Sequence, residues 1–318
     1  MLVWSEDTVA LSENAREVVA AICPRSVSRT HLARHAPNPE LWRQMVELGW
    51  TAIPFSEEEG GLGLGLPEVV VVMEALGREL APTPMLSLLT AGRICASEEV
   101  LGGDIVALTE PARWEDGLRG APRALDASGA VAFLVPTDEG LYRVDREQVR
   151  VEPLRRMDGR DYGIVRLEGA SGALVGGDLD RVLDEATVAL CGEMLGSMRS
   201  LLALTLDYLK VRKQFGVPIG SFQVPQHRAV DAFIQVELAA SAVLAASLDP
   251  RPALVSLAKA RCNEAYLNLA REAIQLHGGV GMTEEHDCGL FLKRARVAAN
   301  TLGTSAMHRD RWARLHGY

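Results

Sequence analysis

The stretch YLKVRKQFGVPIGSFQVPQHRAVD, residues 208–231, joins two long apolar patterns. A helical pattern ends in Arg212, Lys213 and Gln214, after which Phe215 and Gly216 lead into a turn. Cations at the end of a helix complement its dipole, which is one interpretation of these residues. An Arg and a Gln beside an aromatic ring also suit the pyrophosphate and adenine of a nucleotide cofactor. Taken alone, this stretch favours the first interpretation.

A second glycine-rich stretch, AIQLHGGVGMTEEHD, occupies residues 273–287. Gly278 and Gly279 carry no Cβ, so the backbone there can approach a ligand closely. The simpler interpretation is a glycine that ends a helix. Thr283 is the predicted N-cap of the helix that follows. Either stretch by itself is therefore explained by helix ends.

Apolar residues at three- and four-residue steps surround these two stretches and predict long helices. The breakers between them are FGVPIG, DPRP and GGVGM. Helices joined by short breakers indicate an up-and-down bundle. The predicted helices are 179–214, 223–248, 253–277 and a last one that begins at 283.

Upstream of the bundle, short β-rich runs are divided by Gly, Pro and Asp, which predicts a small antiparallel sheet or barrel. The segment before it is helical, with helices over 40–50 and 67–80, the second with a proline in its first turn. The predicted fold class is α+β. The predicted domains are an N-terminal helical domain (1–103), a shortened middle β domain (104–176) and a C-terminal four-helix bundle (177–318).

The net charge of −9 gives no global field that favours nucleic acid or an anionic membrane. The five cysteines are scattered and form no CxxC pair, so neither a disulfide framework nor a zinc site is indicated. The N-terminus lacks a signal-peptide pattern, and apolar runs such as 66–76 are too short and interrupted to span a bilayer. We expect a cytoplasmic protein without membrane insertion.

The sequence lacks the signatures of two classes of enzyme. A di-iron bundle needs Glu-x-x-His pairs on facing helices, and no Glu-x-x-His occurs in the chain. A serine hydrolase of the G-x-S-x-G type also has no match.

Together and in this order, RKQFGVPIGSFQVPQH and QLHGGVGMTEEHD resemble motifs of the acyl-CoA dehydrogenases, a flavoprotein family. The opening helices LWRQMVELGWTAIPFSEEEGGLGLGLPEVVVVMEALGREL resemble those of the same family, and the three-part order is its architecture. The resemblance covers nearly all of the chain. It implies the family's fold, FAD as cofactor and an acyl-CoA thioester as substrate.

The resemblance also implies cofactor contacts. The ADP half of FAD, bound mainly by a neighbouring subunit, would be contacted by Arg212, Gln214 and Phe215. The same cofactor would be lined, across the dimer interface, by Gln275, Gly278 and Gly279. Thr109, in ALTEP, is a candidate contact to the flavin ring. The residues that follow, ARWEDGLRG, do not continue the family's flavin-side pattern.

In most members the catalytic base is the Glu of an E-G-T triplet, which removes the α-proton while hydride leaves the β-carbon. Here the triplet is Leu302, Gly303 and Thr304, so the last two resemble retained cofactor contacts and no base is present. Some relatives carry the base on the first bundle helix, where Glu185 is the weak alternative. Glu185 is more simply a solvated carboxylate at a helix start.

A short chain with a reduced β domain and no base resembles the smaller, non-catalytic subunit of actinobacterial heteromeric acyl-CoA dehydrogenases. Many of these α2β2 enzymes act on sterol-derived CoA thioesters in lipid metabolism. The expected partner is thus a larger catalytic subunit. Two alternatives stay open: a self-sufficient dehydrogenase using Glu185 or another carboxylate, and a non-enzymatic scaffold or CoA-thioester binder.

Overall fold

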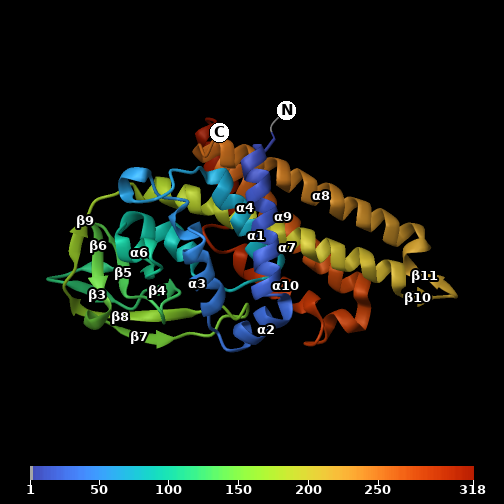
Figure 1. The fold of residues 1–318 in the computed structure, drawn as a ribbon, viewed down its shortest axis with the longest axis horizontal. Coiled ribbons are helices and arrows are strands. Elements are labelled where there is room, and N and C mark those ends of the chain that lie inside the picture. The colour runs from blue at the N-terminus through green and yellow to red at the C-terminus, as the bar shows by residue number, and fades with distance from the viewer. Residues whose placement is uncertain (1–2) are drawn as a thin grey trace. The chain divides into compact units, whose positions relative to one another are not determined.

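In the computed structural model, which describes residues 3–318, helical segments precede and follow a run of β-strands along the chain (Figure 1). This order confirms the predicted α+β class. The chain forms two compact units, one of residues up to Ala20, Val70–Leu80 and Thr187–Tyr318, the other of Ala21–Val69 and Ala81–Ala186. Because the units combine segments distant in sequence, the boundaries at 103 and 176 stay a prediction.

The N-terminal helices begin and end at identifiable residues. Asn38 Oδ1 accepts the backbone N–H groups of Glu40 and Leu41, each at 3.1 Å, which caps one helix. That helix stops before the predicted position 50, because Gly49 takes the left-handed conformation with φ 73°. The helix predicted over 67–80 is confirmed as α4. The bounds are α1 Glu6–Ile22, α2 Arg25–Ala33, α3 Pro39–Glu47, α4 Leu66–Arg78, α5 Met85–Ser87 and α6 Glu98–Leu101.

In the first unit, the C-terminal part of α4 packs backbone to backbone against α7 (Leu179–Val211). A Cβ at Gly196 would collide with the carbonyl of Glu74, so this approach requires glycine. Ser197 Oγ donates to the carbonyl oxygen of Gly77 at 2.9 Å. Arg199 Nη1 lies 2.8 Å from both carboxylate oxygens of Glu74. The crossing is therefore fixed by close approach and by an ion pair.

The strands of the second unit form two small sheets. One has the order β1-β5-β6-β9, and the other has the order β2-β3-β8-β4, with β7 paired to β8. The antiparallel prediction is wrong at one point, because β1 pairs with β5 in parallel. The bounds are β1 Val106–Leu108, β2 Arg113–Trp114, β3 Leu118–Gly120, β4 Arg123–Leu125, β5 Ala132–Thr137, β6 Gly140–Asp145, β7 Arg150–Pro153, β8 Tyr162–Ala170 and β9 Ala173–Val175.

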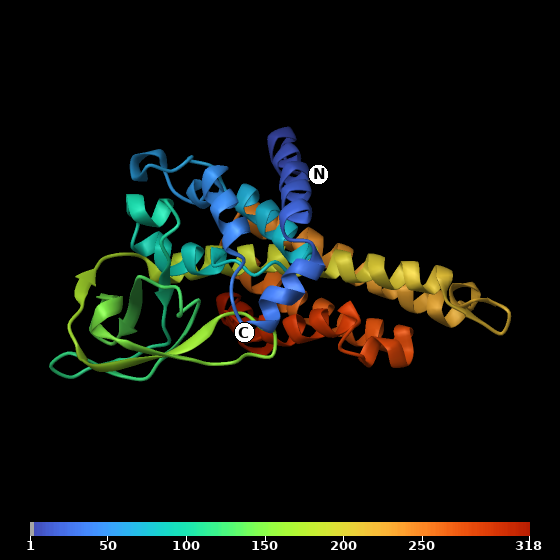
Figure 2. The ribbon, with the colours of Figure 1, turned by 60° about the horizontal axis from the view of Figure 1, so that its bottom comes forward.

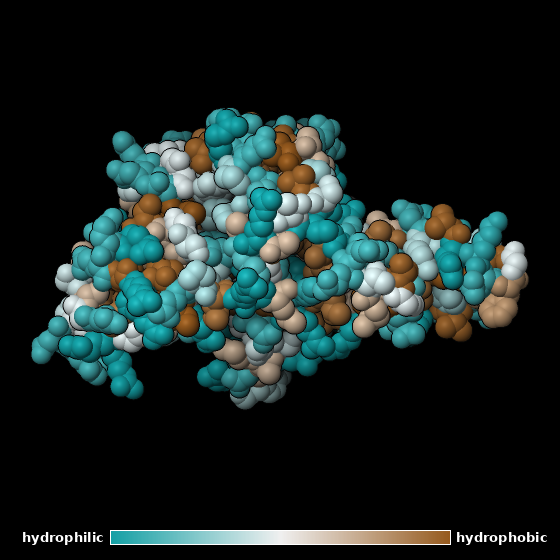
Figure 3. Space-filling model, turned by 90° about the horizontal axis from the view of Figure 1, so that it is seen from below, coloured by the Kyte–Doolittle hydropathy of each residue, from teal (hydrophilic) through white to brown (hydrophobic). Residues whose placement is uncertain are grey.

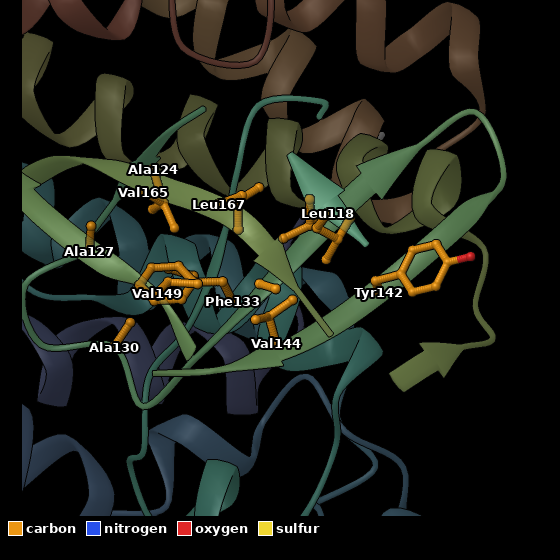
Figure 4. Close-up of a cluster of buried hydrophobic side chains, with 13 residues drawn as sticks. Leu118, Ala124, Ala127, Ala130, Phe133, Tyr142, Val144, Val149, Val165 and Leu167 are labelled. Carbon is orange, nitrogen blue, oxygen red and sulfur yellow. The ribbon is translucent and has the colours of Figure 1, made fainter. Parts of the chain in front are cut away.

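The core of the β region consists of alternate side chains that both sheets direct inward (Figure 4). Phe133 and Val144 come from one sheet and Val165 and Leu167 from the other, all buried. A period of two residues places such side chains on one face of a strand. The β region thus has a hydrophobic core of its own.

The stretch ARWEDGLRG forms the β2–β3 hairpin, which the sequence did not predict. Asp116 and Gly117 turn the chain with φ values of 49° and 123°. Trp114 stacks on Tyr142 with ring centroids 4.4 Å apart. The strands are too short for a periodic signal, so stacking and strand pairing decide their structure.

The bundle follows β9. Its helices after α7 are α8 Gln223–Leu248, α9 Pro252–His277, α10 Asp287–Ala298 and α11 Ser305–Leu315, and α9 contacts α8, α10 and α11. The helices predicted over 223–248 and 253–277 are confirmed. The short hairpin β10 (Lys213–Gln214) and β11 (Val217–Pro218) lies at the tip of the bundle (Figure 2).

The predicted start of the last helix is wrong. Thr283 Oγ1 donates to the carbonyl oxygen of Val280 at 2.9 Å and caps no helix. The N-cap is instead His286, whose ring accepts the N–H of Cys288 at 3.2 Å. The predicted single helix is also two, because the chain turns at Leu302 and Gly303. A buried ion pair between Arg294 and Glu193, at 2.7 Å, ties α10 to α7.

Two helices are long and apolar enough to cross a membrane by length and composition, which corrects the prediction that the apolar runs are too short. Of the apolar window of α7, 78% is buried, as in the core helix of a soluble protein. Of the corresponding window of α8, only 22% is buried. Figure 3 shows hydrophobic residues on the surface of the bundle end that carries β10 and β11.

Candidate functional site

The end of α7 presents three of the predicted cofactor contacts to solvent. Phe215 and Gly216 have φ values of 52° and 83° and form the two-residue turn between β10 and β11. The ring of Phe215 is 93% exposed and touches Phe222 edge-on, with ring centroids 6.1 Å apart. Arg212 and Gln214 are exposed beside it. The ring is therefore accessible to a group outside the chain.

The C-terminal end of α9 and the turn after it hold three more of the predicted contacts, Gln275, Gly278 and Gly279. Gly278, with φ 64°, ends α9, and its N–H donates to the carbonyl oxygens of the last turn. A Cβ built on Gly278 or Gly279 meets no atom within 4 Å. Gln275 is exposed one turn earlier. The backbone of this turn is thus open to a ligand.

Tyr208 and His277 join the two segments. Their rings stack with centroids 4.3 Å apart, and Tyr208 OH donates to the carbonyl oxygen of His277 at 3.3 Å. An ion pair between Arg228 and Glu272, at 3.0 Å, adds a link between α8 and α9. The structure therefore brings the ends of α7 and α9 together, which sequence could only suggest.

His277 was not predicted as a site residue. Its Nδ1 lies 2.8 Å from the carbonyl oxygen of Ala273, which can only accept, so Nδ1 carries the proton. Its Nε2 therefore offers a lone pair, is buried and has no hydrogen-bond partner among the described residues. Burial also lowers the pKa of the imidazole, which keeps it neutral at pH 7. In the sequence, a single His before a glycine pair is a weak signal of a site residue. Only its stacking on Tyr208 in the structure draws attention to it.

Cys288 and His286 lie beside this histidine, and one ring nitrogen or sulfur from each of the three falls within 4.8 Å of the others. The Nδ1 of His286 already accepts the N–H of Cys288, and the Nδ1 of His277 is protonated. Neither Nδ1 is then free to bind a metal. Within this cluster, His286 contributes the N-cap of α10.

Gly303 and Thr304 lie at the opposite end of α10 from the glycine pair. The helix between the two turns, α10, has 12 residues and is about 18 Å long at 1.5 Å per residue. Thr304 caps α11, because its Oγ1 accepts the N–H of Met307 at 3.3 Å. The structure does not bring these two residues to the first group, so a ligand that touches both must be extended.

Leu302, at the position expected for the base, is a half-buried hydrocarbon side chain with φ 55°. The alternative, Glu185, is not the solvated carboxylate predicted. Its side chain is 16% exposed and pairs with Arg93 and Arg181, each at 3.0 Å. Both carboxylate oxygens of Glu185 are therefore already paired with guanidinium groups.

Thr109, the candidate flavin-ring contact, is buried at the end of β1 and bridges to Ala124. Its hydroxyl donates to the carbonyl oxygen of Glu110 at 2.7 Å. The hydroxyl proton is therefore used inside the chain.

Two family models match the chain. They describe the N-terminal domain of acyl-CoA dehydrogenases, over residues 5–101, and the C-terminal domain, over residues 179–315. The acyl-CoA dehydrogenase IpdE2 of Mycolicibacterium smegmatis is 33% identical over 304 residues, which cover 92% of this chain and 94% of that protein.

Solved structures agree in fold. A chain of the ChsE4-ChsE5 complex from Mycobacterium tuberculosis superposes with a TM-score of 0.90 at 26% identity, over 100% of this chain and 99% of that one. A chain of a Tcur3481-Tcur3483 steroid acyl-CoA dehydrogenase variant gives 0.87 at 26% identity, over 98% of each. On this similarity along nearly its whole length, the chain belongs to the acyl-CoA dehydrogenase family.

Proposed function

We propose that this chain is a subunit of an FAD-dependent acyl-CoA dehydrogenase, in which it completes the cofactor site while a partner subunit supplies the catalytic glutamate. One observation carries the proposal: the turn at Gly278 and Gly279 is open to a ligand, whereas the position of the base holds Leu302. A hydrocarbon side chain cannot take the α-proton from a thioester. The chain therefore keeps the means to bind a cofactor without the group that starts the reaction.

The residues present fit FAD. Without a Cβ, Gly278 and Gly279 let backbone N–H groups approach a pyrophosphate, and exposed Arg212 and Phe215 offer a cation and an aromatic face. The buried Nε2 of His277, beside the glycine pair, lacks a hydrogen-bond partner in the described chain and can accept a hydrogen bond from a hydroxyl group. When bound, FAD supplies the hydride-accepting chemistry of α,β-dehydrogenation.

A self-sufficient dehydrogenase that uses Glu185 is the alternative. The two ion pairs of Glu185 argue against it, because both carboxylate oxygens are already occupied by the guanidinium groups of Arg93 and Arg181. Leu302→Glu would add a carboxylate, but the chain would still lack the family's flavin-side pattern after Thr109.

The outer face of α8 supports a protein partner. Val230, Phe233, Ile234 and Leu238 recur at helical spacing on this face, and each is about half exposed. Exposed apolar faces of this kind mark protein–protein contacts. The ChsE4-ChsE5 neighbour is a complex of two different proteins, so we propose a heteromeric partner and expect an α2β2 assembly.

The substrate we propose is a sterol-derived acyl-CoA thioester, since one structural neighbour is a steroid acyl-CoA dehydrogenase. All five cysteines are free thiols, which is consistent with a reducing cytoplasm.

The test is to purify the chain alone and with a co-expressed acyl-CoA dehydrogenase that carries the E-G-T glutamate and is encoded nearby. We expect a colourless protein alone and a yellow, larger assembly with the partner, measured by visible flavin absorbance and native mass. The assembly should oxidise sterol-derived CoA thioesters and lose this activity when the partner's glutamate is replaced.

A matched pair of variants locates the cofactor. Gly279→Leu fills the open turn and should release FAD from the assembly, whereas Gly176→Leu, at a glycine equally free of neighbours, should retain it. If the chain alone is yellow and catalyses the dehydrogenation, the half-site proposal is wrong and Glu185 becomes the candidate base. An assembly without FAD would indicate a scaffold or CoA-thioester binder.

A further inference from the structure

The turn between α10 and α11, which carries Leu302 and Gly303, has an uncommon backbone. Both residues have positive φ, 55° for Leu302 and 106° for Gly303. A branched side chain in the left-handed region costs about 1–2 kcal/mol, so other contacts must maintain this turn. The contacts come from α9 and α11.

On α9, Lys259 and Asn263 lie one turn apart, and both are fully buried. Lys259 Nζ donates to Asn263 Oδ1 at 2.6 Å and to the carbonyl oxygen of Ala298 at 2.8 Å. Asn263 Nδ2 donates to the carbonyl oxygens of Ala299 and Gly303, each at 3.3 Å. Two side chains thus satisfy the end of α10 and the turn beyond it.

On α11, His308 holds the same turn from the other side. Its Nε2 donates to the carbonyl oxygen of Leu302 at 2.8 Å, and its Nδ1 lies 3.4 Å from Ser256 Oγ on α9. A Cβ at Gly303 would lie 2.5 Å from the same Nε2. The turn is therefore in contact with side chains on both sides.

This arrangement is costlier than ending a helix requires. The carbonyl groups of Ala298 and Ala299 belong to buried residues, so the protein itself must supply their partners, and a neutral donor would be enough. Here a buried ammonium does so instead, and desolvation lowers the pKa of Lys259 to about 8. The charged or titratable groups around it are Cys191 of α7, Cys262 of α9 and Arg294 of α10, the last paired with Glu193. A costly network points to a turn whose exact conformation matters.

We propose that Lys259, Asn263 and His308 are positioning residues, which hold Gly303 and Thr304 in the one conformation that contacts the cofactor. The inference rests on the proposed function, since it takes these two residues as part of the FAD site. None of the three side chains needs to touch the cofactor. They act through the carbonyl groups of Ala298, Ala299, Leu302 and Gly303.

The experiment uses the assembly with the catalytic partner and measures native mass, melting temperature, the FAD dissociation constant and the visible circular dichroism of bound flavin. Asn263→Asp keeps the acceptor for Lys259 but removes the donor to Ala299 and Gly303. We expect FAD affinity to fall about tenfold, as for the loss of one or two hydrogen bonds, with a changed flavin signal.

A matched control separates positioning from general stability. Thr205→Val removes another buried polar group in the bundle, one that bonds only within α7, and should lower the melting temperature without changing FAD affinity. At His308, Gln can still donate and should retain most of the affinity, whereas Leu should lose it. This pair also serves if Asn263→Asp fails to fold.

Failure of the two proposals is distinguishable. FAD bound equally well by the wild type, Asn263→Asp and His308→Leu overturns the positioning role and leaves the proposed function intact. A wild-type assembly without FAD overturns both. Weak binding by both Leu and Gln at His308 would indicate a merely structural histidine and count against the proposal.

Discussion

The two glycine turns that flank α10 are built in opposite ways. At the first, a Cβ on Gly278 or Gly279 would meet nothing, and the turn is exposed. At the second, a Cβ on Gly303 would meet the ring of His308, and Lys259 and Asn263 bond the backbone from behind. Glycine therefore has two different roles. At the first turn it leaves space for an external group, and at the second it avoids a clash with a side chain that already fills the space.

The contrast separates two requirements of a binding site. The turn at Gly278 and Gly279, called the open turn, leaves room for an external group, and this costs the folded chain little stability. The turn at Leu302 and Gly303, called the closed turn, is held in its strained conformation by side-chain hydrogen bonds, and this strain lowers the stability of the folded chain. A ligand that contacts both turns would meet one surface with free space and one with a fixed shape.

The largest effect should come from alanine at the closed turn. Gly303→Ala combines positive φ with a contact at 2.5 Å to His308 Nε2 and should lower the free energy of unfolding by about 2–4 kcal/mol. Gly279→Ala, which meets neither problem, should stay within about 0.5 kcal/mol of the wild type. Urea unfolding followed by far-UV circular dichroism measures both. Equal losses at the two glycines would remove the distinction between the turns.

A smaller effect should appear as a pH dependence that only the closed turn has. Lys259 has a pKa of about 8 in the fold, against an ordinary 10.5, so above pH 8 the unfolded chain binds more protons. The free energy of unfolding therefore rises with pH through this group. Between pH 7 and pH 9 the wild type should gain about 1 kcal/mol relative to Lys259→Met.

The measurement is the unfolding free energy of both proteins at the two pH values, since the difference cancels all other titrations. Curves that run parallel for wild type and Lys259→Met would show that Lys259 keeps its ordinary pKa and that its burial carries no cost.

The smallest effect concerns the helix that starts after the closed turn. Thr304→Ala removes the N-cap bond to Met307 and should cost about 0.5–1 kcal/mol, whereas Thr304→Ser keeps the oxygen and should be nearly neutral. Thermal unfolding of the isolated chain resolves the two. If the assembly with its partner loses FAD in Thr304→Ala and not in Thr304→Ser, the hydroxyl also serves the cofactor site.

Prediction succeeded where a periodic signal was long. The helices over 223–248 and 253–277 are as predicted, because many apolar positions and clear breakers define them. The prediction of one last helix from Thr283 is wrong, since neither the cap at His286 nor the turn at Leu302 has a strong local signature. The β2–β3 hairpin was missed because its strands are only two and three residues long.

The sequence by itself determined the fold class, the two motifs at the ends of α7 and α9, and the absence of a glutamate at position 302, because each is a matter of residue type and local spacing. Only the tertiary structure decided that His277 stacks on Tyr208, that Glu185 is held by two arginines, and that a lysine on α9 bonds the end of α10 at Ala298, 39 residues away. Those contacts join residues distant in the chain, and their energy depends on burial and geometry, which no local pattern encodes.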